Sequence, residues 1–154
     1  MKYLLDTCVI SEVIKIRADE NVISWMQNQN EDSLYLSVLT FGEIEKGIEK
    51  APDGTKKRNL QLWVEEDLKK RFEGRIVPID LDVSVKWGAI QGAAELSGNP
   101  MPAIDGLIAV SGLVHNCVVV TRNTVDMKQS TAELLNPWCK RNRKKGQFSH
   151  SRIS

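Results

Sequence analysis

The chain has few of the side chains on which most nucleophilic catalysis relies. Its two histidines are His115, two residues before an apolar run, and His150, in the C-terminal tail. A Ser-His-Asp triad or a Cys-His pair is therefore poorly supported. The phosphate-binding motifs G-x-x-x-x-G-K-[ST] and G-x-G-x-x-G are both absent. What remains for chemistry is carboxylates.

Cysteines and long apolar runs are also scarce. Cys8, Cys117 and Cys139 are odd in number and form no C-x-x-C pair, which argues against a disulfide framework and a zinc site. No apolar stretch approaches the ~20 residues needed to cross a bilayer. Asp6 interrupts the first apolar run too early for a secretory signal. We therefore expect a cytoplasmic protein with no membrane association.

The net charge of +1 hides an uneven distribution. Six of the 21 basic residues and none of the 20 acidic ones lie in residues 140–154, so residues 1–139 carry a net charge of −5. We expect one domain over residues 1–139 and a flexible basic tail over 140–154, because the tail lacks the apolar residues needed for a core. An acidic body can bind a nucleic acid if its carboxylates hold a divalent cation.

Short apolar runs alternate with segments of helical periodicity. This order predicts a three-layer α/β/α sandwich with a central, mainly parallel sheet. The unbroken apolar run CVVVT suits a strand covered on both faces, whereas Pro78 confines its own strand to an edge. We expect strands at residues 3–5, 34–37, 75–79 and 117–121, and helices at 11–16, 21–27, 60–72 and beginning at Thr40, Asp82 and Pro102.

Acidic residues occur where such a fold places its sites. Asp6 follows the first strand, and a lone Asp there is as readily an N-cap. Glu43 lies three residues after Thr40, which is also the spacing of a capping box. Asp105 stands in the apolar segment AIDGLIAV. One interpretation is an acid in the first helical turn that the helix dipole stabilises, and the other is a buried charge that needs a polar partner or a metal ion.

Asn123 and Asp126 follow the last predicted strand, where Asx-turns are the structural alternative. Parallel α/β sheets place their sites at the carboxyl ends of the strands, so all these acids could face one end of the sheet. Such a group of carboxylates repels itself unless a cation is present, and its hard oxygens suit Mg²⁺ or Mn²⁺. This chemistry is typical of phosphodiester hydrolysis.

Five segments resemble the successive motifs of PIN-domain ribonucleases, in particular the VapC/FitB-like toxins of bacterial toxin–antitoxin modules. The resemblance covers roughly residues 1–138 in consistent order and spacing. The segments are LLDTCVISE, SVLTFGEIEKGIE, PAIDGLIA, VVVTRNTVDM and LLNPW.

The resemblance implies a Mg²⁺- or Mn²⁺-dependent endoribonuclease that leaves 3′-hydroxyl and 5′-phosphate ends. It implies Asp6 and Asp105 as the main metal ligands, and Glu43 as a further ligand or as the group that orients the attacking water. It further implies an antitoxin that blocks the cleft, and a homodimer. Asn123 and Asp126 complete the implied site, with Thr7 and Thr121 as supporting hydroxyls.

The chain departs from the family pattern at two positions. Cys8 stands where many relatives have Asn, and Asn123 stands where many PIN domains have Asp. The second departure removes one negative charge and leaves open an inactive PIN fold used for binding. A third reading is a phosphotransfer domain with Asp6 as phosphoacceptor, although Asp6-Thr7-Cys8 lacks the D-x-D pair of haloacid dehalogenases.

Deleting residues 140–154 should weaken RNA binding, because the tail would draw phosphates toward an acidic body. Lys140, Arg141, Arg143, Lys144 and Lys145 form the basic run. The slope of log K against log salt should flatten by about 0.7 for each phosphate of single-stranded RNA that the tail neutralises. Single-turnover cleavage at saturating RNA should stay nearly unchanged. Unchanged affinity and slope in the truncated chain would contradict a binding role.

Overall fold

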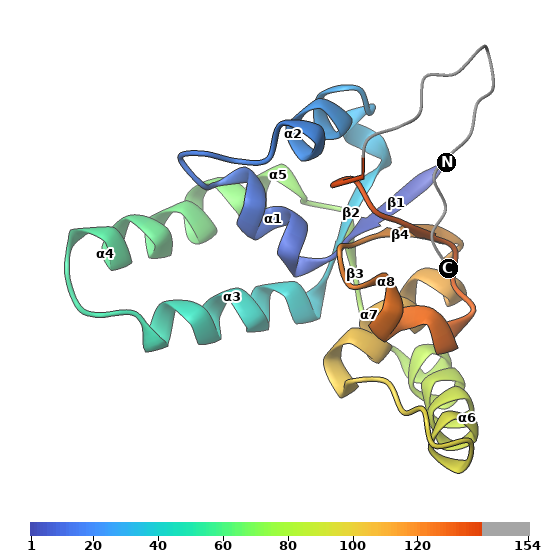
Figure 1. The fold of residues 1–154 in the computed structure, drawn as a ribbon. Helices are drawn as coiled ribbons and strands as arrows, with labels where there is room; N and C mark the ends of the chain where they lie inside the picture. Colours follow the sequence, from blue (N-terminus) through green and yellow to red (C-terminus); the bar gives the residue numbers. More distant parts are fainter. Residues whose placement is uncertain (140–154) are drawn as a thin grey trace.

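The computed structural model describes residues 1–139, arranged around one sheet (Figure 1). All strand pairs are parallel, in the order β3-β2-β1-β4-β5. The basic tail and its boundary lie outside the described residues and stay predictions. The strands are β1 (Lys2–Leu5), β2 (Leu34–Ser37), β3 (Ile76–Val77), β4 (Cys117–Val120) and β5 (Leu134–Leu135).

Helices cover both faces of the sheet and confirm the expected three-layer sandwich. One face is covered by α1, α2, α3 and the α4–α5 segment (Figure 1). The other face is covered by α7 and α8, and α6 packs on the outer side of α7. The helices are α1 (Thr7–Val13), α2 (Glu20–Gln27), α3 (Val38–Lys50), α4 (Thr55–Leu62), α5 (Lys69–Arg71), α6 (Leu81–Leu96), α7 (Ala103–Val114) and α8 (Thr124–Met127).

The strands are apolar on both sides because each side packs against helices. Successive side chains of a strand point to opposite faces, so Leu5 joins the core beneath α1 and α2 while Leu4 joins the core beneath α7. Val118 and Val119 divide in the same way. This arrangement explains the unbroken apolar run of β4 and confirms its interpretation as an internal strand.

Several helices begin before the residues expected from sequence, and three of them show the same cause. Asp6 caps α1, which therefore starts at Thr7 and ends before residues 14–16. Ser37, not Thr40, caps α3 by accepting from the backbone N–H of Leu39 at 3.1 Å. Asp80 caps α6 through the N–H of Val83. In each case a side-chain acceptor one position before the helix determines its start.

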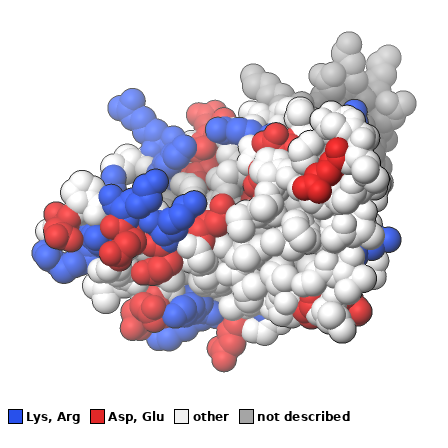
Figure 2. All heavy atoms as spheres, turned by 90° about the horizontal axis from the view of Figure 1, so that it is seen from below, with Lys and Arg blue, Asp and Glu red and all other residues white. Residues whose placement is uncertain are grey.

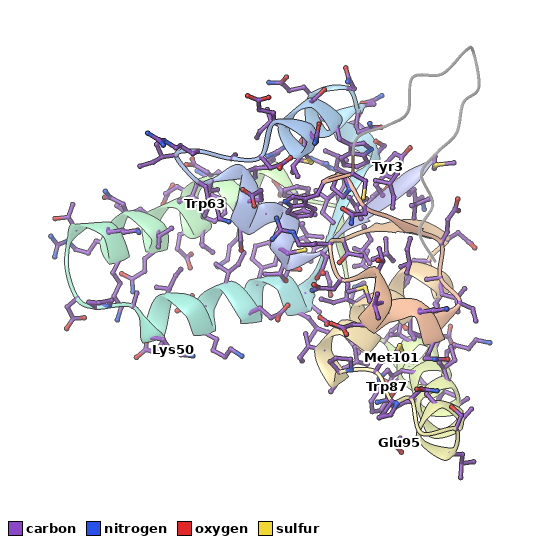
Figure 3. All side chains as sticks on the ribbon, viewed as in Figure 1. Tyr3, Lys50, Trp63, Trp87, Glu95 and Met101 are labelled. Atoms are coloured by element: carbon purple, nitrogen blue, oxygen red, sulfur yellow. The ribbon has the colours of Figure 1, made fainter. Side chains whose placement is uncertain are left out.

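The start of α7 differs from expectation in two respects. Pro102 precedes the helix in the N-cap position, and the first helical residue is Ala103. Ile104, which belongs to the apolar segment AIDGLIAV, is 39% exposed instead of buried. Met101 and Trp87 pack together at the junction of α6 and α7 (Figure 3). The buried side chain of Gln91 holds this junction by donating to the carbonyl of Met101 at 2.7 Å and accepting from its N–H at 3.0 Å.

The helix expected at residues 60–72 forms part of a longer helical segment. It begins at Thr55 and contains a π-helical stretch, Trp63–Leu68, between α4 and α5. Trp63 packs from this stretch against the core (Figure 3). Strand β5 and helix α8 were not anticipated, because two and four residues are too short for a periodic signal.

Charge is unevenly spread over the surface. Figure 2 shows charged side chains crowding the half formed by α3 and α4, while the half formed by α6 is mostly uncharged. Leu81, Val85 and Leu96 on α6 are 77%, 65% and 93% exposed. Within residues 1–139, no helix has the length and apolar character required to cross a membrane.

Substituting Gly112 with alanine should destabilise the fold by about 1–3 kcal/mol, because α7 approaches β4 closely there. A Cβ atom at Gly112 would lie 2.3 Å from Cγ2 of the buried Val119. Gly47→Ala in α3 is the control, since its Cβ would meet nothing within 4 Å. That variant should gain about 0.5–1 kcal/mol from helix propensity. Urea unfolding of both variants would show equal stability if the close approach were absent.

Candidate functional site

The carboxylate of Asp6 lies at the junction of β1 and α1, where it is 2% exposed. Oδ1 accepts from the backbone N–H of Thr7 at 2.8 Å, and Oδ2 accepts from the hydroxyl of Thr121 at 2.7 Å. Burial raises the pKa of Asp6, and these hydrogen bonds oppose the rise. Asp6 is thus the N-cap of α1, as considered above, and also a buried carboxylate that is hydrogen-bonded to Thr121 at the end of β4.

Thr121 connects the ends of β1 and β4. Its Oγ1 donates to Asp6 and accepts from the backbone N–H of Asn123 at 2.9 Å. The loop after β4 is therefore tied to the carboxylate at the end of β1. Asn123 directly precedes α8, which carries Asp126 in its first turn.

Glu43 is positioned by a contact across the fold and not by capping. The hydroxyl of Thr7 donates to Oε1 of Glu43 at 2.6 Å, and it lies 3.1 Å from the hydroxyl of Thr40. Thr40 is buried within α3, and Ser37 caps that helix. The capping-box interpretation of Thr40 and Glu43 is therefore wrong, and the Thr7 hydroxyl holds Glu43 beside Asp6.

The charges of three other acids influence the pKa of Asp105. Burial raises the pKa of Asp105 to about 6, and the charges of Asp6, Asp126 and Glu43 contribute to the rise, in that order. Asp6, Glu43 and Asp126 therefore all lie within electrostatic reach of Asp105. These four are the acidic residues that the sequence singled out.

Cys8 occupies the space between the two strand ends. Its thiol donates to Oδ2 of Asp6 at 3.5 Å, lies 3.8 Å from the hydroxyl of Thr121 and accepts from the N–H of Arg122 at 3.5 Å. Burial and the charge of Asp6 raise the pKa of the thiol to about 12. Cys8 is therefore a neutral donor to Asp6 at neutral pH.

Sequence reasoning missed a polar cluster beside the acids. The guanidinium of Arg122 lies 4.2 Å from the ring centroid of Trp138 and 3.5 Å from Oε1 of Glu12. Glu12 is 5% exposed and also accepts from Lys15. No local pattern could have revealed the cluster, because its members come from α1, the loop after β4 and the segment after β5.

The acids do not enclose a metal ion as they stand. Within residues 1–139, no three His, Cys, Asp or Glu side chains are close enough to hold one. Mg²⁺ is bound through one or two carboxylates and keeps several of its waters. An open, oxygen-only and mutually repelling set of carboxylates matches that mode of binding and does not suit a closed zinc site.

In metal-free buffer, Asp105 should make the fold less stable as pH rises. Between pH 3.8 and about 6 the folded chain keeps a proton on Asp105 that the unfolded chain has released. Asp105→Asn removes this effect, so its melting temperature should rise relative to wild type by a few degrees between pH 4 and pH 8. Asp82→Asn, an exposed acid on α6, is the control. A wild-type–Asp105→Asn difference independent of pH would contradict the shift.

Comparison with known proteins identifies the family of this chain. A family model described as PIN domain matches residues 3–129. VapC ribonuclease Y4jK of Sinorhizobium fredii is 33% identical over 135 residues, covering 88% of this chain and 96% of that protein. Toxin FitB of Neisseria gonorrhoeae is also 33% identical, covering 88% of this chain and 97% of its own length.

Solved structures show the same arrangement over nearly the whole chain. The crystal structure of FitAcB from Neisseria gonorrhoeae matches with a TM-score of 0.85 at 33% identity, covering 90% of this chain and 99% of that one. DNA-bound VapBC from Salmonella typhimurium matches with a TM-score of 0.71 at 25% identity, covering 90% and 99%. By sequence and fold, the chain belongs to the PIN-domain family.

Proposed function

We propose that this protein is a divalent-metal-dependent endoribonuclease and the toxin of a toxin–antitoxin pair. The observation that carries the proposal is the convergence of Asp6, Glu43, Asp105 and Asp126 at one edge of a parallel sheet. The names of the relatives support it, since one is a VapC ribonuclease and another is the toxin FitB, each 33% identical to this chain. A cytoplasmic location belongs to the same proposal.

Asp6, Asp105 and Glu43 are the residues that would hold Mg²⁺ or Mn²⁺, with Asp126 and Asn123 completing the set. When bound, the ion would lower the pKa of a water molecule and offset charge on the phosphate. It would also relieve the repulsion that raises the pKa of Asp105. Asn123 contributes an amide oxygen and no charge, so Asp126 would supply the fourth negative charge of the site.

The neighbouring hydroxyls would fix the orientation of these acids. Thr121 holds Oδ2 of Asp6, and Thr7 holds Oε1 of Glu43, which leaves Oε2 of Glu43 free of the Thr7 bond. Glu43 would use that oxygen to bind the ion or to orient the attacking water. Both threonines act as positioning residues, because their contacts are to the acids themselves.

The geometry argues against Asp6 as a phosphoacceptor. Its carboxylate is 2% exposed, and both oxygens accept hydrogen bonds from the fold. A nucleophile must reach an incoming phosphoryl group, and this carboxylate is held away from solvent. Asp6 therefore suits the binding of an ion better than the acceptance of a phosphoryl group.

The toxin proposal includes a protein partner and a homodimer. Structural relatives at 32% and 33% identity are FitAB bound to a DNA fragment and FitAcB. We infer that a cognate antitoxin covers the acidic edge of this chain and prevents cleavage. A basic side chain from that partner would complement the four carboxylates.

Purified protein should cleave single-stranded RNA with Mg²⁺ or Mn²⁺, leaving 3′-hydroxyl and 5′-phosphate ends, and EDTA should stop the reaction. Asp6→Asn, Glu43→Gln and Asp105→Asn should each slow single-turnover cleavage about 100-fold or more, the scale for removing one charge-stabilising group. The same variants should lose growth inhibition when expressed.

Glu45→Gln is the matched control, since Glu45 lies on the same helix as Glu43, two residues away. It should cleave like the wild type. Circular dichroism should show that every variant is folded. A folded wild-type protein that binds RNA with no metal-dependent cleavage would identify an inactive PIN fold used for binding.

A further inference from the structure

The cluster of Arg122, Trp138 and Glu12 lies next to the acids but has no part in the proposed chemistry. Arg122 directly follows Thr121, and its backbone N–H donates to the thiol of Cys8, which itself contacts Asp6. The backbone of Arg122 is therefore anchored at the acidic site. Its side chain extends from that point along α1 to Glu12 and Trp138.

The neighbours of the guanidinium orient it but do not occupy all of its hydrogen-bond donors. It lies 4.2 Å from the Trp138 ring centroid, within the range of a cation–π contact. Its nearest nitrogen is 3.5 Å from Glu12, longer than the roughly 2.7–2.9 Å of a charge-assisted hydrogen bond. The side chain is 54% exposed. The donor groups of Arg122 thus remain open to a ligand.

Both partners of Arg122 are themselves held in place. Glu12 accepts from Lys15 Nζ at 3.1 Å and from the N–H of Asp19 at 3.2 Å. The carbonyl of Trp138 accepts from the side chain of Asn21 at 3.1 Å. Since Glu12 shares its charge among several donors, it orients Arg122 without neutralising it fully. A preorganised cation of this kind loses little freedom on binding an anion.

Helix α1 connects the cluster to the acids. Cys8 and Glu12 are four residues apart on α1, so they share a face and are separated by about 6 Å along the helix axis. Cys8 contacts Asp6, and Glu12 contacts the guanidinium of Arg122. The cation and the acidic site therefore lie along the same face of this helix.

We propose that Arg122, held by Trp138 and Glu12, binds a backbone phosphate of the RNA strand close to the cleaved bond. This inference rests on the proposed ribonuclease function. Four converging carboxylates repel a polyanion, so the RNA strand needs a cation close to the point of cleavage. Arginine suits this role because its planar fork binds two phosphate oxygens at once. This contact would involve only the RNA backbone, so it would give no preference for particular bases.

The test compares RNA affinity and cleavage in Arg122 variants. Arg122→Gln keeps much of the side chain that packs on Trp138 but removes the charge. Its dissociation constant for a short single-stranded RNA should rise about tenfold, and the slope of log K against log salt should flatten by about 0.7. Cleavage at saturating RNA should stay within about twofold of wild type. Arg122→Lys should keep the salt slope while binding more weakly than wild type.

Arg58→Ala is the matched control, because it also removes one arginine. Arg58 lies on α4, where its side chain contacts Thr55 and none of the site acids. It should leave both the dissociation constant and the salt slope unchanged. Arg122→Gln that binds like Arg58→Ala would overturn the proposal. So would an effect confined to the cleavage rate at saturating RNA, which would mark Arg122 as a support for the acids.

Binding is measured in the Asp105→Asn background, so the result does not depend on cleavage. If no form of the protein cleaves RNA, the proposed function fails, while the binding comparison still decides the role of Arg122. Glu12→Gln provides a second variant that leaves Arg122 intact. It should bind RNA more weakly than the parent but more tightly than Arg122→Gln, because the guanidinium keeps its charge and loses one of the two groups that orient it. Binding by a folded Glu12→Gln protein as tight as that of the parent would contradict the orienting role of Glu12.

Discussion

A carboxylate that is almost completely buried needs hydrogen bonds to compensate for the water it loses. Asp6 obtains them from Thr7, the next residue in the chain, and from Thr121 at the end of β4. Those bonds determine where α1 begins and how the loop after β4 is held. The positions of Asn123, Arg122 and α8 follow from that loop. The burial of one acid therefore organises most of the surrounding site.

The site is electrostatically strained as well as ordered. Its acids come from the start of α1 and from α3, α7 and α8, and their charges contribute to the raised pKa of Asp105. The fold tolerates this repulsion because Thr7 and Thr121 hold two of the acids, while a tightly packed α7 carries the third. A rigid fold thus maintains an arrangement of charge that the isolated side chains would avoid.

The sequence predicted secondary structure best where a local residue pattern has a single physical cause. Apolar runs predicted β1, β2 and β4, and the rule for parallel sheets predicted that the acids after them converge. Helix starts were displaced because Ser37 and Asp80 cap one position before the helix. Glu43 resembled a capping residue because its true partner, Thr7, is 36 residues away. The Arg122 cluster depends on three distant segments, so no window of sequence contains it.

The parallel topology also determines when the acidic edge can form during synthesis of the chain. The Thr121–Asp6 bond spans 115 residues, and ribosomes add about 5–20 residues per second, so Thr121 is synthesised roughly 6–23 s after Asp6. Throughout that interval β1, the central strand, lacks β4 on one side. The emerging chain consequently cannot assemble its acidic edge until Thr121 has left the ribosome. A partner protein that recognises the completed edge could therefore bind the chain only after that point.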